Sequence, residues 1–256
     1  MKYKTYQRNH AIIPGREKAL EAFLKQDYRG MRHKLKNGIS SNSEDALTWS
    51  CFEVIANFAF SKKISVLDEN LEDAYEGKCN FKFIDQKYLD DEIKIFIGKE
   101  YKGATSKEGT EVDASIELPD KIIFFEAKLY SSISLKDESK NKPHDQIARK
   151  LRVGLDYAHD SKKEFYFIFL DIAPSSELLK FTKDKNKERA LDGSKGKWKS
   201  AWWFNYYKKG WKKNLKPLRE ILKGIPYTSE QSVANNMGWL TWSDLFKSIL
   251  RGILTP

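Results

Sequence analysis

Apolar and polar residues alternate with a period of two in the middle of the chain. Every second residue from Val112 to Leu118 is apolar, and the residues between them are polar or acidic. This is the pattern of a β-strand with one buried face. A turn signal follows at residues 119–120 (Pro-Asp), and residues 122–129 are rich in β-branched and aromatic side chains. The pattern predicts a β-hairpin over residues 111–129.

The turn determines which residues of the two strands face each other. With the turn centred on residues 119–120, Asp113 lies opposite Glu126, and Glu111 lies opposite Lys128. Directly opposed residues share one face, with Cβ atoms about 4.5–5.5 Å apart. Two carboxylates at this spacing repel each other unless positive charge lies between them. The hairpin therefore predicts a divalent metal ion at Asp113 and Glu126, with Lys128 beside it.

Further helices and strands are expected on both sides of the hairpin. The order from residue 43 is helix, three strands, helix, strand, with the flanking elements at 44–60, 93–97, 143–158 and 164–171. Ser43 is the expected N-cap of the first helix. Loops are expected in three places: 98–109, 131–142, and an insertion at 69–77 within the mixed, polar residues 61–92. We expect the α/β fold class.

Composition narrows the class of partner and the compartment. The 256 residues carry a formal net charge of +10, which points to a polyanion such as nucleic acid, although a lysine-rich composition also arises by drift. The two cysteines, Cys51 and Cys79, lack the spacing of metal ligands or of a disulfide scaffold. No apolar run approaches the roughly 20 residues that span a bilayer, and the first residues do not resemble a signal peptide. We expect a soluble, cytoplasmic protein with no membrane partner.

Two polar residues on the flanking helices are candidates for the same site. Glu44 lies on the axis of the apolar face of the first helix, whereas Asp45 is expected on the exposed side and Glu53 in solvent. The alternative role for Glu44 is interaction with the helix macrodipole alone. Gln146 lies in the first turn of the second helix, and Lys150 one turn later can share its face. Gln146 can equally be an ordinary exposed helix residue.

Magnesium suits this set of oxygen donors. Mg²⁺ prefers oxygen ligands and keeps several of its waters, so two or three carboxylates and a carbonyl suffice. The expected ligands are Asp113, Glu126, Glu44 and the Ala127 carbonyl, and Mn²⁺ can substitute for Mg²⁺. Two further acidic residues share the polar face of the hairpin: Glu111 and Glu117. No P-loop pattern is present, so ATP dependence is not expected.

Asp113 followed by Glu126-Ala127-Lys128 resembles the Asp…Glu-x-Lys signature of the PD-(D/E)xK phosphodiesterases, the restriction-endonuclease-like nucleases. Val112 stands where that family name has proline. The expected element order is also the αβββαβ order of the family core. The resemblance implies a mixed central sheet flanked by helices, with residues 41–173 as the nuclease core. Residues 1–40 would add a basic N-terminal helix, and residues 174–256 a mainly helical, aromatic and basic extension.

The resemblance also implies a role for each site residue. Asp113 and Glu126 would hold the metal, and Glu44 would join them from the side. Lys128 would position or deprotonate the attacking water or stabilise the phosphate; neutralisation of the carboxylates is its alternative role. Gln146 would correspond to a glutamine or lysine that reaches the site in similar nucleases.

These features predict a Mg²⁺-dependent nuclease that hydrolyses DNA, of a restriction or defence type, with RNA as a further candidate substrate. A homodimer is expected from the symmetry of cutting two strands with one site per chain. Two alternatives stay open: a repair or recombination nuclease, such as a junction resolvase or exonuclease, and a catalytically silent nucleic-acid-binding module.

Aromatic and basic residues are interleaved between residues 195 and 213. The aromatic side chains are expected to pack in a core. The lysines between them suit contacts to DNA phosphates. The expected DNA-binding residues are Lys195, Lys197, Lys199, Lys208, Lys209, Lys212 and Lys213.

Overall fold

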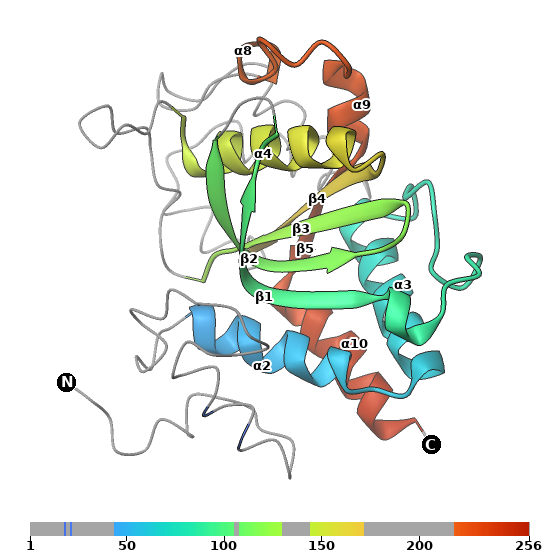
Figure 1. Ribbon diagram of the computed structural model, residues 1–256. Helices are drawn as coiled ribbons and strands as arrows, with labels where there is room; N and C mark the ends of the chain where they lie inside the picture. The colour runs from blue at the N-terminus through green and yellow to red at the C-terminus, as the bar shows by residue number, and fades with distance from the viewer. Residues whose placement is uncertain are drawn as a thin grey trace, which may run out of the picture.

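The computed structural model describes residues 44–104, 108–129, 144–171 and 218–255, together with Lys18 and Glu21. Helices cover both faces of a five-stranded mixed sheet (Figure 1), so the expected α/β class and the mixed sheet flanked by helices are confirmed. Among these residues, no helix combines the length and apolar character that crossing a membrane requires. Several predicted features lie outside the described residues: the N-terminal helix, Ser43, the 131–142 loop and the seven lysines at 195–213.

The strands follow one another across the sheet in the order of the sequence. The first three are antiparallel: β1 (Lys94–Lys102), β2 (Gly109–Glu117) and β3 (Lys121–Ala127). β4 (Glu164–Asp171) pairs with β3 in parallel, and β5 (Met237–Thr241) pairs with β4 in parallel. β5 was not predicted from the sequence, and it adds a strand from the expected C-terminal extension to this sheet.

The helices divide between the two faces of the sheet (Figure 1). One face is covered by α2 (Glu44–Ala56), α3 (Phe60–Tyr75) and α10 (Trp242–Leu254). The other face is covered by α4 (Gln146–Asp160) and the short helices α8 (Leu218–Ile221) and α9 (Glu230–Asn235). A 3₁₀ turn, η2 (Asp90–Glu92), leads into β1.

The hairpin has the register that the turn predicts. Ala114 pairs with Phe125, and Glu117 pairs with Ile122. Continuing this register by one residue places Asp113 opposite Glu126. The hairpin prediction is therefore confirmed in both its strands and its alignment.

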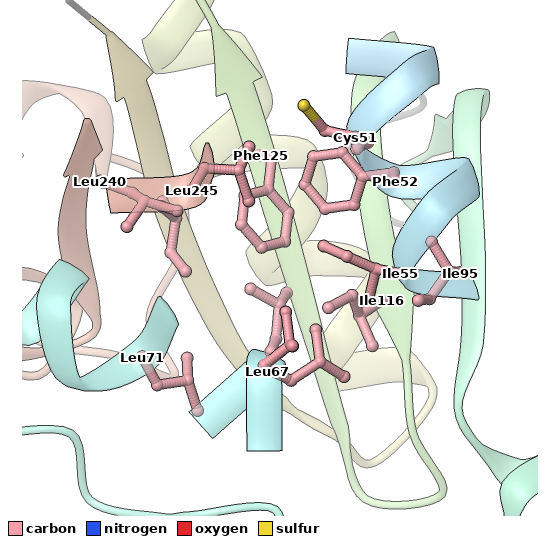
Figure 2. Close-up of a cluster of buried hydrophobic side chains, with 14 of the residues drawn as sticks. Cys51, Phe52, Ile55, Leu67, Leu71, Ile95, Ile116, Phe125, Leu240 and Leu245 are labelled. Carbon is pink, nitrogen blue, oxygen red and sulfur yellow. The ribbon is translucent and has the colours of Figure 1, made fainter. Parts of the chain in front are cut away.

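A buried apolar cluster fixes α2 against the hairpin. Figure 2 shows Phe52 of α2 beside Phe125 of β3, and their ring centroids are 4.8 Å apart in an edge-on arrangement. Ile55 and Ile116 extend the same contact, and all four side chains are buried. Rigid packing here determines where the first residue of α2 lies relative to the end of β3.

Three local predictions are corrected by the structure. The strand predicted at 93–97 continues to Lys102, so residues 98–102 of the segment expected to be a flexible loop belong to β1. Residues 69–75 of the expected insertion belong instead to α3, whose apolar residues pack into the core. α4 begins after Asp145, because the Asp145 side chain accepts hydrogen bonds from the N–H groups of Ile147 and Ala148.

Candidate functional site

Five charged side chains meet where the end of β3 approaches the first turns of α2 and α4. Four of them lie in regular elements: Glu44 in α2, Asp113 in β2, Glu126 in β3 and Lys150 in α4. The fifth, Lys128, directly follows β3. Glu44 is the first residue of α2, where the partial positive charge of the helix N-terminus favours a carboxylate. The sequence predicted four of these residues as site residues and placed Lys150 one turn after Gln146, where it could share the same helical face.

Glu126 lies at the centre of the group and has no exposed surface. The Lys128 ammonium is 2.6 Å from its Oε1, and the Lys150 ammonium contacts its Oε2. Lys150 Nζ also lies 3.3 Å from Oδ2 of Asp113. Because both lysines are almost completely buried, the two carboxylates and the two ammonium groups neutralise each other in a region with little water.

The backbone of β3 holds Asp113 in place. The N–H of Ala127 donates a hydrogen bond to Oδ2 of Asp113 at 2.8 Å. This bond joins the site residue of one hairpin strand to the backbone of the other. Asp113 retains some exposure, at 21% of its side chain, so the site meets solvent on this side.

Glu44 completes the group from α2. Its Oε1 lies 3.3 Å from Lys128 Nζ, and its Oε2 accepts a hydrogen bond from the N–H of Leu129 at 3.1 Å. The side chain is one-quarter exposed. The bonds of Glu44 to Lys128 and Leu129 go beyond a macrodipole role, which alone would not require contact with the end of β3.

Glu126 and Asp113 differ in their affinity for protons. Burial and the neighbouring Asp113 charge raise the pKa of Glu126 to about 7, although Lys150 and Lys128 oppose the shift. Burial also acts to raise the pKa of Asp113, but Lys150, Lys128 and the Ala127 N–H outweigh it and hold that pKa below its ordinary value. As pH falls through about 7, the pair therefore takes up its proton on Glu126, while Asp113 keeps its charge.

Both lysines remain charged in this setting. Burial acts to lower the pKa of Lys128, but Glu126, Asp113 and Glu44 more than compensate and raise it. The pKa of Lys150 is raised in the same way, since Asp113 and Glu126 outweigh burial and the repulsion from Lys128. Lys128 and Lys150 thus act as permanent cations at this site.

Two acidic residues of α2 lie differently from their predicted places. Asp45 is half-buried rather than on the exposed side, and burial together with the charges of Asp113 and Glu44 raises its pKa to about 6. Glu53 is buried rather than in solvent, and Asn57 donates to its Oε1 at 3.0 Å. The reason is that α2 packs against the sheet on one side and against α3 and α10 on others. The helix α2 therefore has no fully exposed face.

The three remaining candidates are Gln146, which lies one turn before Lys150, and Glu117 and Glu111, whose described contacts or strand partners lie outside this group. Gln146 is the first residue of α4, one turn before Lys150, and is half-buried. Glu117 points elsewhere: it accepts a hydrogen bond from the Tyr101 hydroxyl at 2.7 Å and pairs with Lys99. Glu111 lies opposite Glu100 in the β1–β2 ladder.

The donor chemistry of the group suits Mg²⁺ or Mn²⁺. Asp113, Glu126 and Glu44 present only oxygen ligands, which these ions prefer, and their oxygens are already held by cationic ammonium groups. In the described part of the chain, no three acidic, histidine or cysteine side chains are grouped as ligands of one ion. The Ala127 carbonyl accepts a hydrogen bond from Lys128 Nζ at 3.0 Å. The residues fit a metal that would share the carboxylates with these lysines.

Comparison with models of known protein families, with curated proteins and with solved structures found no match to this chain.

Proposed function

We propose that this chain is a Mg²⁺-dependent nuclease of the PD-(D/E)xK type that hydrolyses DNA phosphodiester bonds. The observation that carries the proposal is the convergence of Asp113, Glu126 and Lys128 at one end of the hairpin, with Glu44 beside them. A buried glutamate with a pKa near 7 and two buried lysines have no evident purpose in packing alone, because apolar residues of similar size are often at least as stabilising there. Such groups concentrate at functional sites.

The order of elements supports the same assignment. Leaving out α3, the chain runs α2, β1, β2, β3, α4, β4, which is the αβββαβ order of the restriction-endonuclease-like core. In this proposal, α3 and the unit formed by β5 and α10 are additions to that core. Function is nevertheless argued from the site, since a fold alone does not determine function.

Each residue has a defined task in the proposed reaction. Asp113, Glu126 and Glu44 would hold the ion, which supplies Lewis-acid activation of water and neutralises phosphate charge. Glu126 would give up its proton on binding the ion, because the two compete for the same oxygens. Lys128, at the edge of the carboxylates, would orient the attacking water or stabilise the negative charge that builds up on the phosphate.

The net charge of +10 supports DNA as the substrate, because basic surfaces bind the phosphate backbone with an affinity that falls steeply with salt. We place the protein in the cytoplasm as a restriction- or defence-type endonuclease that acts as a homodimer. These finer assignments follow from the sequence and from symmetry.

Cleavage of supercoiled plasmid tests the proposal. The wild-type protein should nick or linearise the plasmid with Mg²⁺ or Mn²⁺ and not with EDTA. Asp113→Asn and Lys128→Met should each lower the rate by about 10²-fold or more. Lys121→Met is the matched control, because Lys121 is a buried lysine at the opposite end of β3 from Lys128 and pairs with Asp120.

The outcomes separate the alternatives. Preferential cutting of branched or linear-ended DNA would identify a junction resolvase or an exonuclease. DNA binding without cleavage under any metal condition would contradict the proposal and favour a silent binding module. Equal cleavage by Lys128→Met and the wild type would show that the site is wrongly assigned.

A further inference from the structure

The peptide group between Lys128 and Leu129 is bonded on both of its sides. Its carbonyl oxygen accepts a hydrogen bond from the indole N–H of Trp242 at 2.9 Å. Its N–H donates to Oε2 of Glu44 at 3.1 Å. The C=O and N–H of one peptide lie in one plane. The bond from Trp242 therefore also sets the direction in which the Leu129 N–H points.

This peptide lies beyond the regular pairing of the sheet. β3 ends at Ala127, and the N–H of Lys128 donates to the carbonyl of Leu170 in β4 at 2.7 Å. That bond fixes the peptide before Lys128. The next peptide is held by Trp242 and Glu44, which belong to α10 and α2.

Trp242 is carried on a well-fixed support. It is the first residue of α10 and directly follows β5, which pairs with β4 through Leu240 and Thr241. The Thr241 hydroxyl caps the helix by accepting a hydrogen bond from the N–H of Asp244 at 3.1 Å. The Trp242 side chain is buried in the same apolar cluster as Phe52 and Phe125. Its indole N–H is therefore presented to the site in one orientation.

Two site residues depend on this orientation. Lys128 carries the ammonium that lies 2.6 Å from Glu126 and 3.3 Å from Glu44, and Leu129 supplies the N–H that holds the second oxygen of Glu44. If the buried carbonyl lost its donor, it would keep the cost of being removed from water. The peptide would then rotate toward another partner and displace both Lys128 and Glu44.

We propose that Trp242 is a positioning residue of the site, which fixes the Lys128–Leu129 peptide and through it the Lys128 ammonium and the Glu44 carboxylate. Its effect on catalysis rests on the proposed nuclease function. Its effect on the peptide can be measured without any activity. The helix α10 thereby contributes to the geometry of the site through its first residue, Trp242.

Trp242→Phe tests this inference, because it removes the donor and keeps an aromatic ring. Trp239→Phe is the matched control: it makes the same change at a buried tryptophan of β5 whose side chain packs near Phe169. Amide exchange measured by NMR should be about fivefold to tenfold faster at Leu129 in Trp242→Phe, as expected for the loss of one hydrogen bond. Exchange at Leu129 should not change in Trp239→Phe, and exchange at Ile123 should not change in either variant.

The kinetic readout distinguishes positioning from general weakening. In Trp242→Phe, kcat for Mg²⁺-dependent cleavage should fall by about tenfold or more while KM for DNA changes little, since a small misplacement of a reacting group affects the chemical step most. Trp239→Phe should keep the wild-type kcat. Should Trp242→Phe not fold, the indole N–H of Trp242 in the wild-type protein decides: slow exchange supports its bond to Lys128, and fast exchange overturns it.

Each result has a defined meaning. Wild-type exchange at Leu129 in Trp242→Phe would overturn the inference whatever the activity. Faster exchange with an unchanged kcat would also overturn it, because the peptide would then be held without any effect on the site. If the wild-type protein cleaves nothing, the proposed function fails, and the exchange rate alone still decides whether Trp242 orders this peptide.

Discussion

Lys150 Nζ lies 3.3 Å from Oδ2 of Asp113 and also contacts Glu126. The two acids come from neighbouring strands, and the lysine comes from the helix that covers them. In the described structure the ammonium thus occupies the side of the carboxylates that faces α4. A metal ion bound to the same acids would have to share them with Lys150.

Replacing Lys150 with Met should destabilise the metal-free protein by about 3–5 kcal/mol, because it breaks buried ion pairs and leaves Asp113 and Glu126 with Lys128 as their one remaining nearby cation. Mg²⁺ should recover a large part of this loss by neutralising the same oxygens. Urea unfolding with EDTA and with Mg²⁺ measures both effects. Lys63→Met serves as control, since Lys63 is a buried lysine paired with Asp90 at 2.6 Å, away from these acids. An equal loss with and without Mg²⁺ would show that the ion does not reach Asp113 and Glu126.

The stability of the metal-free protein should fall as pH rises from about 4.5 to about 7. The folded state raises the pKa of Glu126 from 4.5 to about 7, so it keeps a proton that the unfolded chain releases in this interval. This contribution is fully present below pH 4.5 and is lost as pH passes through 7. Unfolding free energies of the wild type and Glu126→Gln between pH 4.5 and 8 provide the measurement. The difference between the two proteins should change across this range, and a constant difference would contradict the raised pKa.

Gly154→Ala should destabilise the protein by about 1–3 kcal/mol through overpacking. A Cβ at Gly154 would lie 2.1 Å from the ring of Phe165, so α4 would have to move away from β4. This movement would shift Lys150, one turn earlier on the same helix, and should also lower cleavage. Thermal unfolding and plasmid cleavage can be compared with Gly109→Ala, whose Cβ would meet its nearest atom at 3.7 Å. Similar stability of the two variants would argue against close helix–strand contact at Gly154.

Phe52→Ala should cost about 3–5 kcal/mol by opening a cavity in the core. Because Phe52 fixes α2 against Phe125, the variant should also loosen the bond between Glu44 and Leu129. Urea unfolding and amide exchange at Leu129 measure the two effects. A stability loss with unchanged exchange at Leu129 would show that α2 holds its first turn in place without this contact.

The hairpin and β4 could be predicted from the sequence because their signals are local. Residues 112–118 alternate and a turn follows, while residues 165–170 form an uninterrupted apolar run. The alternation also predicts that Asp113 and Glu126 share one face. Together with Lys128, they are three of the five site residues, and all three follow from the hairpin segment.

β5 and Trp242 could not be predicted in this way. β5 has five residues, all buried, and therefore shows no alternation. Its partner β4 lies far away in the sequence, and parallel pairing requires no turn between the two strands. Nothing near Trp242 indicates a bond to Lys128, because that contact exists only after the sheet is complete. The sequence signal for α3 is weak for a different reason. Polar residues are so frequent in this segment that the helical spacing of its apolar residues does not stand out.

We expect the Lys128–Leu129 peptide, bonded to both Glu44 and Trp242, to be among the last parts of the site to become ordered during folding. The hairpin and α4 bring together Asp113, Glu126 and Lys150 through contacts that are close in sequence and therefore quick to form. The docking of α2 and of α10 requires much longer loops to close. An intermediate with only the hairpin and α4 would hold three of the charged groups around a peptide with no fixed direction. The last contacts to form in such a sequence are the ones that set the geometry of Lys128, so a partly folded chain would carry the acids without the ordered site.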